Sequence, residues 1–217
     1  MARYSKFSTS LEALQRPPGT QRLWIQGLWT ANALNRCIAQ MAPESQWLQI
    51  WADDHWFQPD CLLRLLAHNV DVVAPFCLLR SPPFRLSMFH ERHEGTYEFY
   101  RWEELQGKRG LLPVDTCGGP GVVIRREVLD AVGPPWFVGL AGEHPQEDLY
   151  SFARMRAKGF QPYVDLDTPI DHLTSMSVKP EPQPDGSWAI RVWSNVDICL
   201  LPPYDGPSGI MRESEAK

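Results

Sequence analysis

The chain has 217 residues, of which 43% are hydrophobic and 22% are charged, as in an ordinary globular protein. This length suits one α/β domain with a sizeable buried core. The net charge of −5 gives no basic footprint, which argues against a protein that binds nucleic acid or an anionic membrane through charge.

Cysteine usage and the N-terminal segment predict a cytoplasmic protein. The five cysteines are scattered along the chain, and no two of them form a CxxC pair. Neither a zinc knuckle nor a disulfide framework is expected, and reduced, mostly buried thiols are the simplest interpretation. Residues 1–19 lack the apolar stretch of a signal peptide, and no apolar run is long enough to cross a membrane. We therefore expect no transmembrane segment.

The first third of the chain predicts an alternation of strands and helices. Residues 22–27 predict a short strand, and residues 31–41 predict a helix because their apolar side chains recur at helical spacing. The apolar run at residues 47–51 predicts a buried strand, Pro59 opens a second helix, and residues 70–79 predict the next strand. This order predicts a doubly wound, mostly parallel central sheet with helices on both faces, where ligands bind beyond the carboxyl ends of the strands.

The second half is less regular. Residues 80–112 predict a loop-rich segment with a candidate strand at 96–102, and the histidines at 90 and 93 lack matching ligands nearby, which favours a solvated loop. A short strand is expected at 122–124, a helix ending at Gly159, and a further strand at 163–166.

A change of composition divides the chain. We expect residues 1–178 to form one domain. Residues 179–217 are rich in Pro, Asp, Gly and Ser, and we expect them to form an extension with an edge hairpin and a disordered tail.

The segment Asp53-Asp54-His55 is the first candidate site. A carboxylate and an imidazole two residues apart, just beyond a strand, can bind the same cation, and this oxygen and nitrogen ligation favours Mn²⁺ over Ca²⁺ while Mg²⁺ stays open. The alternative is a polar turn in which an aspartate caps the following helix. Spacing alone does not separate the two interpretations.

The order of the remaining motifs resembles the GT-A glycosyltransferases, especially their family 2-like members, over about residues 28–175. In that family a DxD or DxH motif follows a strand and binds a metal ion together with the diphosphate of a nucleotide-sugar. Asp53 and His55 match the DxH form, and Asp54 matches the acidic middle residue near the ribose or sugar. His172, which follows a later strand, matches the histidine that can complete the metal shell; the alternative is a hydrogen-bonded surface histidine.

Further motifs of the resemblance concern the donor and the acceptor. The glycines of the turn Gly118-Gly119-Pro120-Gly121 match a Gly-rich turn on the acceptor side, although a plain tight turn explains them too. Glu147 and Asp148 match an acidic pair that opens a helix, where carboxylates are also favoured by the helix dipole. The Ala-Arg-Asn signature of the family is Ala33-Leu34-Asn35 here, so Asn35 is retained as a donor-binding candidate and the arginine is lost. The chain also leaves little room for the family's first strand.

The resemblance implies a metal-dependent glycosyltransferase using Mn²⁺ or Mg²⁺. It would move a sugar from a nucleotide-diphosphate donor to a hydroxyl of a glycan or other acceptor. Inversion is expected, with Asp148 as the base and Glu147 as the close alternative. Two other functions stay open. One is a degenerate GT-A domain that binds a glycan or a partner without catalysis. The other is a sugar nucleotidyltransferase, whose usual Gly-rich, Arg- and Lys-containing loop is missing here.

Overall fold

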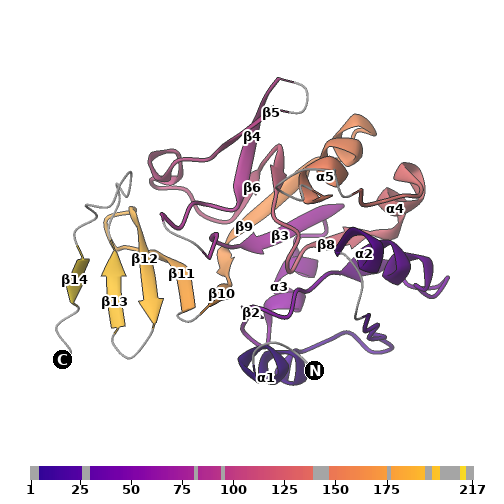
Figure 1. Ribbon diagram of the computed structural model, residues 1–217, viewed down its shortest axis with the longest axis horizontal. Coiled ribbons are helices and arrows are strands. Elements are labelled where there is room, and N and C mark those ends of the chain that lie inside the picture. Colours follow the sequence, from indigo (N-terminus) through magenta and orange to yellow (C-terminus); the bar gives the residue numbers. More distant parts are fainter. Residues whose placement is uncertain are drawn as a thin grey trace.

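The computed structural model describes residues 5–25, 30–80, 83–93, 96–138, 147–174, 177–193, 197–200 and 211–213. These residues form α-helices and one short 3₁₀-helix around three β-sheets of five, six and three strands (Figure 1). The helices are α1 (Ser5–Ala13), α2 (Thr30–Ala39), α3 (Cys61–Ala67), η1 (Trp102–Leu105), α4 (Arg126–Val132) and α5 (Glu147–Ala157).

The five-stranded sheet is the centre of the fold. Its strand order is β1 (Trp47–Gln49), β8 (Val123–Arg125), β3 (Val72–Phe76), β9 (Pro162–Pro169) and β6 (Leu111–Pro113). Only β3 and β9 pair in parallel, whereas β1 with β8, β8 with β3, and β9 with β6 are antiparallel.

The expected mostly parallel central sheet is therefore wrong. Strand β8, which was expected at 122–124, enters between β1 and β3 and runs against both. Strand β6 adds a second antiparallel neighbour at the far edge. Apolar runs of this kind show that a strand is buried, but they carry no information about its direction or its neighbours. The whole fold is mixed α/β with mostly antiparallel pairing.

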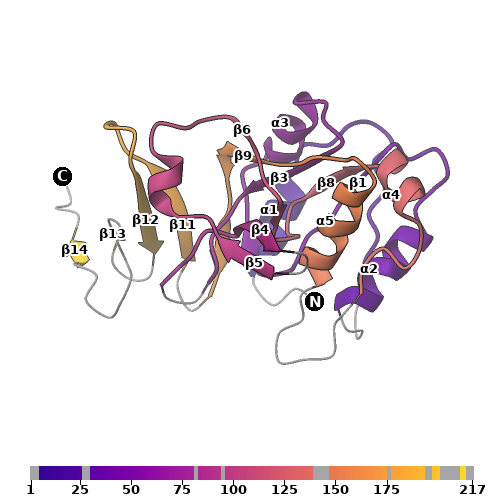
Figure 2. The ribbon, with the colours of Figure 1, turned by 90° about the horizontal axis from the view of Figure 1, so that it is seen from above.

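Both faces of the central sheet are covered by helices, as the sequence predicted. Successive residues of β3 point to opposite faces, so Val72 and Ala74 pack in one core while Val73 packs in the other. The first core includes Phe152 of α5, and we call it the α5-side core; the second includes Leu65 of α3, and we call it the α3-side core. The two views of the ribbon place α3 and α5 on opposite sides of the sheet (Figures 1 and 2). Every residue of β3 is buried, which explains its unbroken apolar sequence.

The six-stranded sheet is antiparallel throughout. Its order is β14 (Met211–Glu213), β13 (Asp197–Leu200), β12 (Trp188–Trp193), β11 (Ser177–Pro182), β10 (Asp171–Leu173) and β2 (His55–Trp56). Strands β12 and β13 pair with each other, but β14 lies beyond β13, so the pair is not at the edge of the sheet as was expected. The expected boundary after residue 178 falls inside β11, and Trp188 of β12 lies in the α5-side core.

Three local expectations need correction. The segment with the histidines at 90 and 93 is strand β4 (Met88–His93), which pairs with β5 (Thr96–Phe99) and β7 (Thr116–Cys117) in the three-stranded sheet. Residues 22–25 form no strand, and the rest of that expected strand lies outside the described residues. The tail expected to be disordered was residues 212–217; residues 212 and 213 belong to β14, and residues 214–217 lie outside the described part.

Gly121 connects the Gly-rich turn at residues 118–121 to the central sheet through a backbone hydrogen bond. Its N–H donates a hydrogen bond of 2.6 Å to the carbonyl oxygen of Ile50, just after β1. The backbone has φ of +79°, and a Cβ atom there would lie 2.5 Å from Cγ of Pro75. Gly133 has a similar φ of +66°, but nothing lies within 4 Å of its would-be Cβ.

We expect Gly121→Ala to lower the free energy of unfolding by roughly 2–5 kcal/mol, because left-handed strain and steric overlap add. Gly133→Ala carries the strain alone and should cost roughly 1–2 kcal/mol. Urea unfolding of both variants measures the difference, and equal losses would contradict the close packing of Pro75 on Gly121.

Candidate functional site

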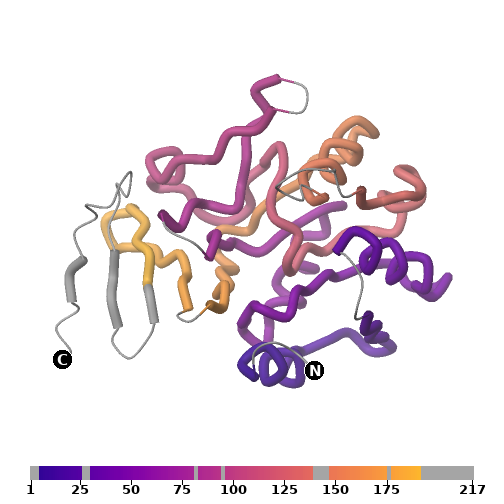
Figure 3. Tube along the Cα trace, viewed as in Figure 1, coloured from indigo at the N-terminus to yellow at the C-terminus, as the bar shows by residue number. Residues whose placement is uncertain are grey.

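The candidate site lies where three strands of the central sheet end. Because β1 and β3 are both antiparallel to β8, they run in the same direction, and β9 is parallel to β3. Their carboxyl ends therefore lie at one edge of the sheet although the sheet is mixed. Asp54 and His55 follow β1, Cys77 follows β3, and His172 follows β9. The Cα trace shows residues 72–76 beside residues 162–169 (Figure 3).

Aromatic packing positions the segment after β1. Phe57 is buried, stacks on Trp51 with ring centroids 3.7 Å apart, and meets Phe7 of α1 edge to face at 6.2 Å. The backbone N–H of Phe57 also lies 3.4 Å from the hydroxyl oxygen of Ser10, in the same helix. These contacts hold the ends of the turn that carries the acidic residues and His55.

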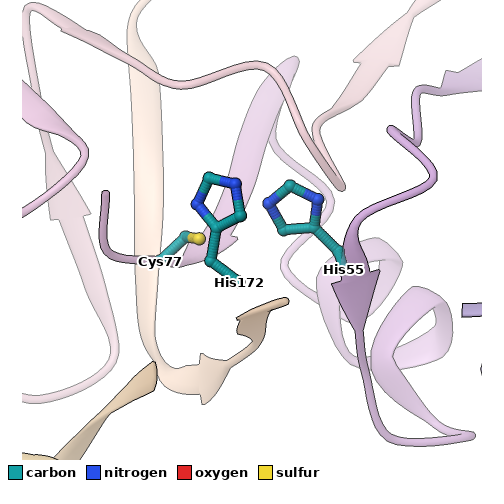
Figure 4. Close-up of side chains that lie close together, drawn as sticks. All are labelled: His55, Cys77 and His172. Carbon is teal, nitrogen blue, oxygen red and sulfur yellow. The ribbon is translucent and has the colours of Figure 1, made fainter. Parts of the chain in front are cut away.

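His55 and His172 meet face to face. They are register partners in the antiparallel pair of β2 and β10, which places both side chains on the same face of the sheet. Their rings are stacked with centroids 4.3 Å apart. The Cys77 thiol lies on the other side of His172, and the ligand atoms of the three residues are all within 4.8 Å of one another (Figure 4). Side chains that are far apart in the sequence thus form one compact cluster.

Nε2 of His55 is buried without a hydrogen bond of good geometry. Only 1% of the residue is exposed, and its Nδ1 is paired with Oδ1 of Asp54 at 3.0 Å. His172 differs, because its Nδ1 lies 2.9 Å from the carbonyl oxygen of Leu78 and must donate to it. Its Nε2, which lies 3.5 Å from Oδ2 of Asp54, is the ring nitrogen that remains for a cation.

Asp54 supports both imidazoles. Its Oδ2 accepts a hydrogen bond of 2.9 Å from Arg80 and lies 3.5 Å from Nε2 of His172. Burial acts to raise the pKa of Asp54, but the hydrogen bonds and charges of His172 and His55 outweigh it and hold that pKa well below its ordinary value. Asp54 is thus an ionised partner of the histidines, whereas the resemblance places it at the ribose or sugar.

The His55 imidazole and the Cys77 thiol are neutral when no cation is bound. Burial and the nearby charge of His172 lower the pKa of His55, although Asp54 acts in the opposite direction. Burial also raises the pKa of the Cys77 thiol far above its ordinary value. A neutral imidazole is the form that binds metal ions.

A second group of functional candidates lies at the Gly-rich turn. The N–H of Gly119 donates a hydrogen bond of 2.9 Å to Oδ2 of Asp148, and a Cβ at Gly119 would lie 2.6 Å from Oδ1. Glycine is therefore needed for this contact. Burial and the charge of Glu147 raise the pKa of Asp148 to about 6, and the bond from Gly119 opposes them. Among the described residues, Oε2 of the buried Glu147 has no hydrogen-bond partner.

The two groups are joined by short backbone connections. The carbonyl oxygen of Cys77 accepts a hydrogen bond of 3.0 Å from the N–H of Ser87. The carbonyl oxygen of Ser87 accepts one of 3.0 Å from the N–H of Gly118, next to the glycine that binds Asp148. The histidine cluster and the Asp148 carboxyl therefore belong to one continuous region.

Not every expected residue joins this region. Asp53 is half-buried in the turn after β1. The cluster of close ligand atoms consists of His55, His172 and Cys77 and does not include Asp53. The amide of Asn35 donates to the carbonyl oxygen of Phe137 and accepts from the N–H groups of Trp136 and Phe137. Asn35 therefore connects α2 to the loop that contains Trp136 and Phe137. Cys77 was not predicted as a site residue. It follows directly after the buried strand β3, just as the acidic residues follow β1, and this position could have identified it.

Comparison with known proteins adds little. No family model and no curated protein matches the sequence. A solved structure described as A197 from STIV resembles the chain with a TM-score of 0.46 and 17% identity, over 76% of this chain and 73% of that one. Similarity this weak carries no conclusion. Among the described residues, every helix is too short or too polar to cross a membrane.

The raised pKa of Asp148 gives a test of its surroundings. Its carboxyl ionises near 3.8 in the unfolded chain and near 6 in the folded one, so its ionisation removes stability as the pH rises through this window. Asp148→Asn keeps an oxygen for the N–H of Gly119 and has nothing to ionise. Between pH 4 and pH 6 the wild type should lose about 2 kcal/mol relative to this variant. Urea unfolding across that range measures it, and a constant difference would contradict the raised pKa.

Proposed function

We propose that this chain is a metal-dependent glycosyltransferase that moves a sugar from a nucleotide-diphosphate donor to an acceptor hydroxyl. The observation that carries the proposal is the stacked pair of His55 and His172 at the carboxyl edge of β1, β3 and β9. The resemblance assigns both histidines to the same metal shell. Their adjacency supports the ligand set that the resemblance implies.

The histidine pair suits a divalent cation. Nδ1 of the buried His55 pairs with Asp54, whereas its Nε2 has no hydrogen-bond partner that a bound cation would have to displace. His172 would bind through Nε2 while Leu78 fixes its ring, and Asp53, from the same turn as His55, would supply an oxygen ligand. The resemblance implies Mn²⁺ or Mg²⁺. When bound, the ion would stabilise the negative charge on the departing nucleoside diphosphate.

Asp148 is the proposed base. With a pKa of about 6, its carboxyl is ionised at neutral pH and is more basic than an ordinary aspartate. It would take the proton of the acceptor hydroxyl as that oxygen attacks the anomeric carbon. The N–H of Gly119 keeps the carboxylate in place, and the close approach at this glycine suits an acceptor on the turn. Glu147 is the alternative base.

A second candidate is a non-catalytic domain that binds a glycan or partner. Two residues that the resemblance assigns to the donor make contacts within the protein instead. Asp54 pairs with Arg80 and the histidines, and Asn35 binds the loop at Phe137. These contacts favour a domain whose donor site has been lost.

Thermal unfolding with nucleotides tests the donor site. We expect one of UDP, GDP, CDP and dTDP to stabilise the wild type only when a divalent cation is present. At a hundredfold excess over Kd the gain should be about 2.7 kcal/mol. His172→Ala should abolish the response, whereas His93→Ala, on the exposed end of β4, should keep it. Glycan binding without any metal-dependent nucleotide response would favour the non-catalytic domain.

The role of Asp148 is tested by kinetics with the donor that this screen identifies. Asp148→Asn should lower kcat by at least about 100-fold, because the proton acceptor is lost. In the wild type, kcat should rise about tenfold per pH unit up to about pH 6 and then level off, since the base must be ionised. Glu147→Gln serves as the matched variant. If it loses activity while Asp148→Asn retains it, the base is Glu147.

A further inference from the structure

The third member of the histidine cluster is a thiol that the proposed function does not use. Cys77 is the first residue after β3, is 8% exposed, and lies within 4.8 Å of the ligand atoms of both histidines. Figure 4 shows its sulfur beside His172, with the ring of His55 on the far side. Each of the three side chains comes from a different strand end, so the cluster is fixed by the packing of the sheet.

We propose that His55, Cys77 and His172 bind a borderline transition metal of the Zn²⁺ class, with Cys77 as a thiolate ligand. The inference rests on the same histidine pair as the proposed function, but it concerns which ion binds and can be tested without sugar transfer. Two imidazoles and one thiolate are a ligand set of three, which leaves a fourth tetrahedral position for a water or a substrate oxygen.

The surroundings of the cluster suit such an ion. His55 supplies a ring nitrogen that is buried and has no hydrogen-bond partner. The carbonyl oxygen of Leu78 accepts from Nδ1 of His172 at 2.9 Å and so orients that ring. It also accepts from the thiol of Cys77 at 3.4 Å, a hydrogen bond that is lost when the thiol gives up its proton to become a ligand. The Asp54 carboxylate lies 3.0 Å from Nδ1 of His55, as carboxylates do behind zinc-bound histidines, and leaves Nε2 of that ring for the ion.

Ligand chemistry separates this ion from the one that the resemblance implies. Thiolate and imidazole favour Zn²⁺ and Co²⁺, whereas Mg²⁺ and Mn²⁺ prefer carboxylate, carbonyl and water oxygens. Binding replaces the thiol proton of Cys77 with the metal and releases that proton to solvent. The two positive charges of the ion are then partly balanced by the thiolate and by Asp54.

Cobalt spectroscopy tests the proposal on the full chain. The metal-free protein is titrated with Co²⁺, whose absorption reports both a tetrahedral site and a thiolate ligand. We expect intense visible bands together with a thiolate-to-cobalt band in the near ultraviolet, and loss of both when Zn²⁺ is added. Zn²⁺ should bind at least about 100-fold more tightly than Mn²⁺ in a competition titration.

Two cysteine variants provide the comparison. Cys77→Ser should abolish the near-ultraviolet band and weaken Zn²⁺ binding by more than about 100-fold, since even outer-shell partners contribute 10–100-fold. Cys61→Ser is the matched control, because Cys61 is a buried thiol of the same α3-side core but is not part of the cluster, and it should leave both unchanged. The cobalt spectrum of the wild type requires no substitution, so it decides the point even if Cys77→Ser unfolds.

The outcomes separate this inference from the proposed function. A cobalt complex without the thiolate band, or tighter binding of Mn²⁺ than of Zn²⁺, would overturn the role of Cys77 and leave the histidine pair as a metal site. Binding of none of these ions would overturn both proposals. A thiolate-bound metal with no metal-dependent response to any nucleotide would support this inference and contradict sugar transfer.

Discussion

The pairing of β2 with β10 is the interaction on which the candidate site depends. Strand β2 has only two residues, yet its register with β10 sets His55 opposite His172. The N–H of Leu173 also donates to the carbonyl oxygen of Asp54, which locks the same register. A slip of β2 by one residue would turn His55 to the other face of the sheet, away from His172. The chemistry of the site is therefore fixed by backbone hydrogen bonds.

Burial on both faces of β3 is the second constraint. Because its residues alternate between the α5-side and α3-side cores, the strand has no free face and its end is held firmly. Cys77 and Leu78 continue directly from this rigid strand. Pro75 packs on Gly121, so the same strand positions the Gly-rich turn, which binds the carboxyl group of Asp148. One well-packed element thus determines where a thiol, a carbonyl oxygen and a glycine turn lie.

The sequence located the central elements but not their directions, and it missed α1 and β4. Apolar periodicity located α2, β1, α3, β3 and α5, and it predicted helices on both faces of the sheet. It gave no sign that β8 inserts against β1 and β3, because an apolar triplet reads the same in either direction. Motif order placed His55 and His172 in one site. It missed Cys77, since a buried thiol after a strand looks like ordinary core until its neighbours are known.

The six-stranded sheet has a consequence for the integrity of the molecule. It runs without a break from β2, beside the histidines, to the last strands of the chain. Trp188 of β12 meets Phe76 of β3 edge to face at 4.8 Å, and its indole N–H donates to the carbonyl oxygen of Leu105. The C-terminal strands are thus neither an appendage nor a separate folding unit. We expect the whole chain to unfold in one cooperative step, with shortening from the C-terminus felt at the histidines.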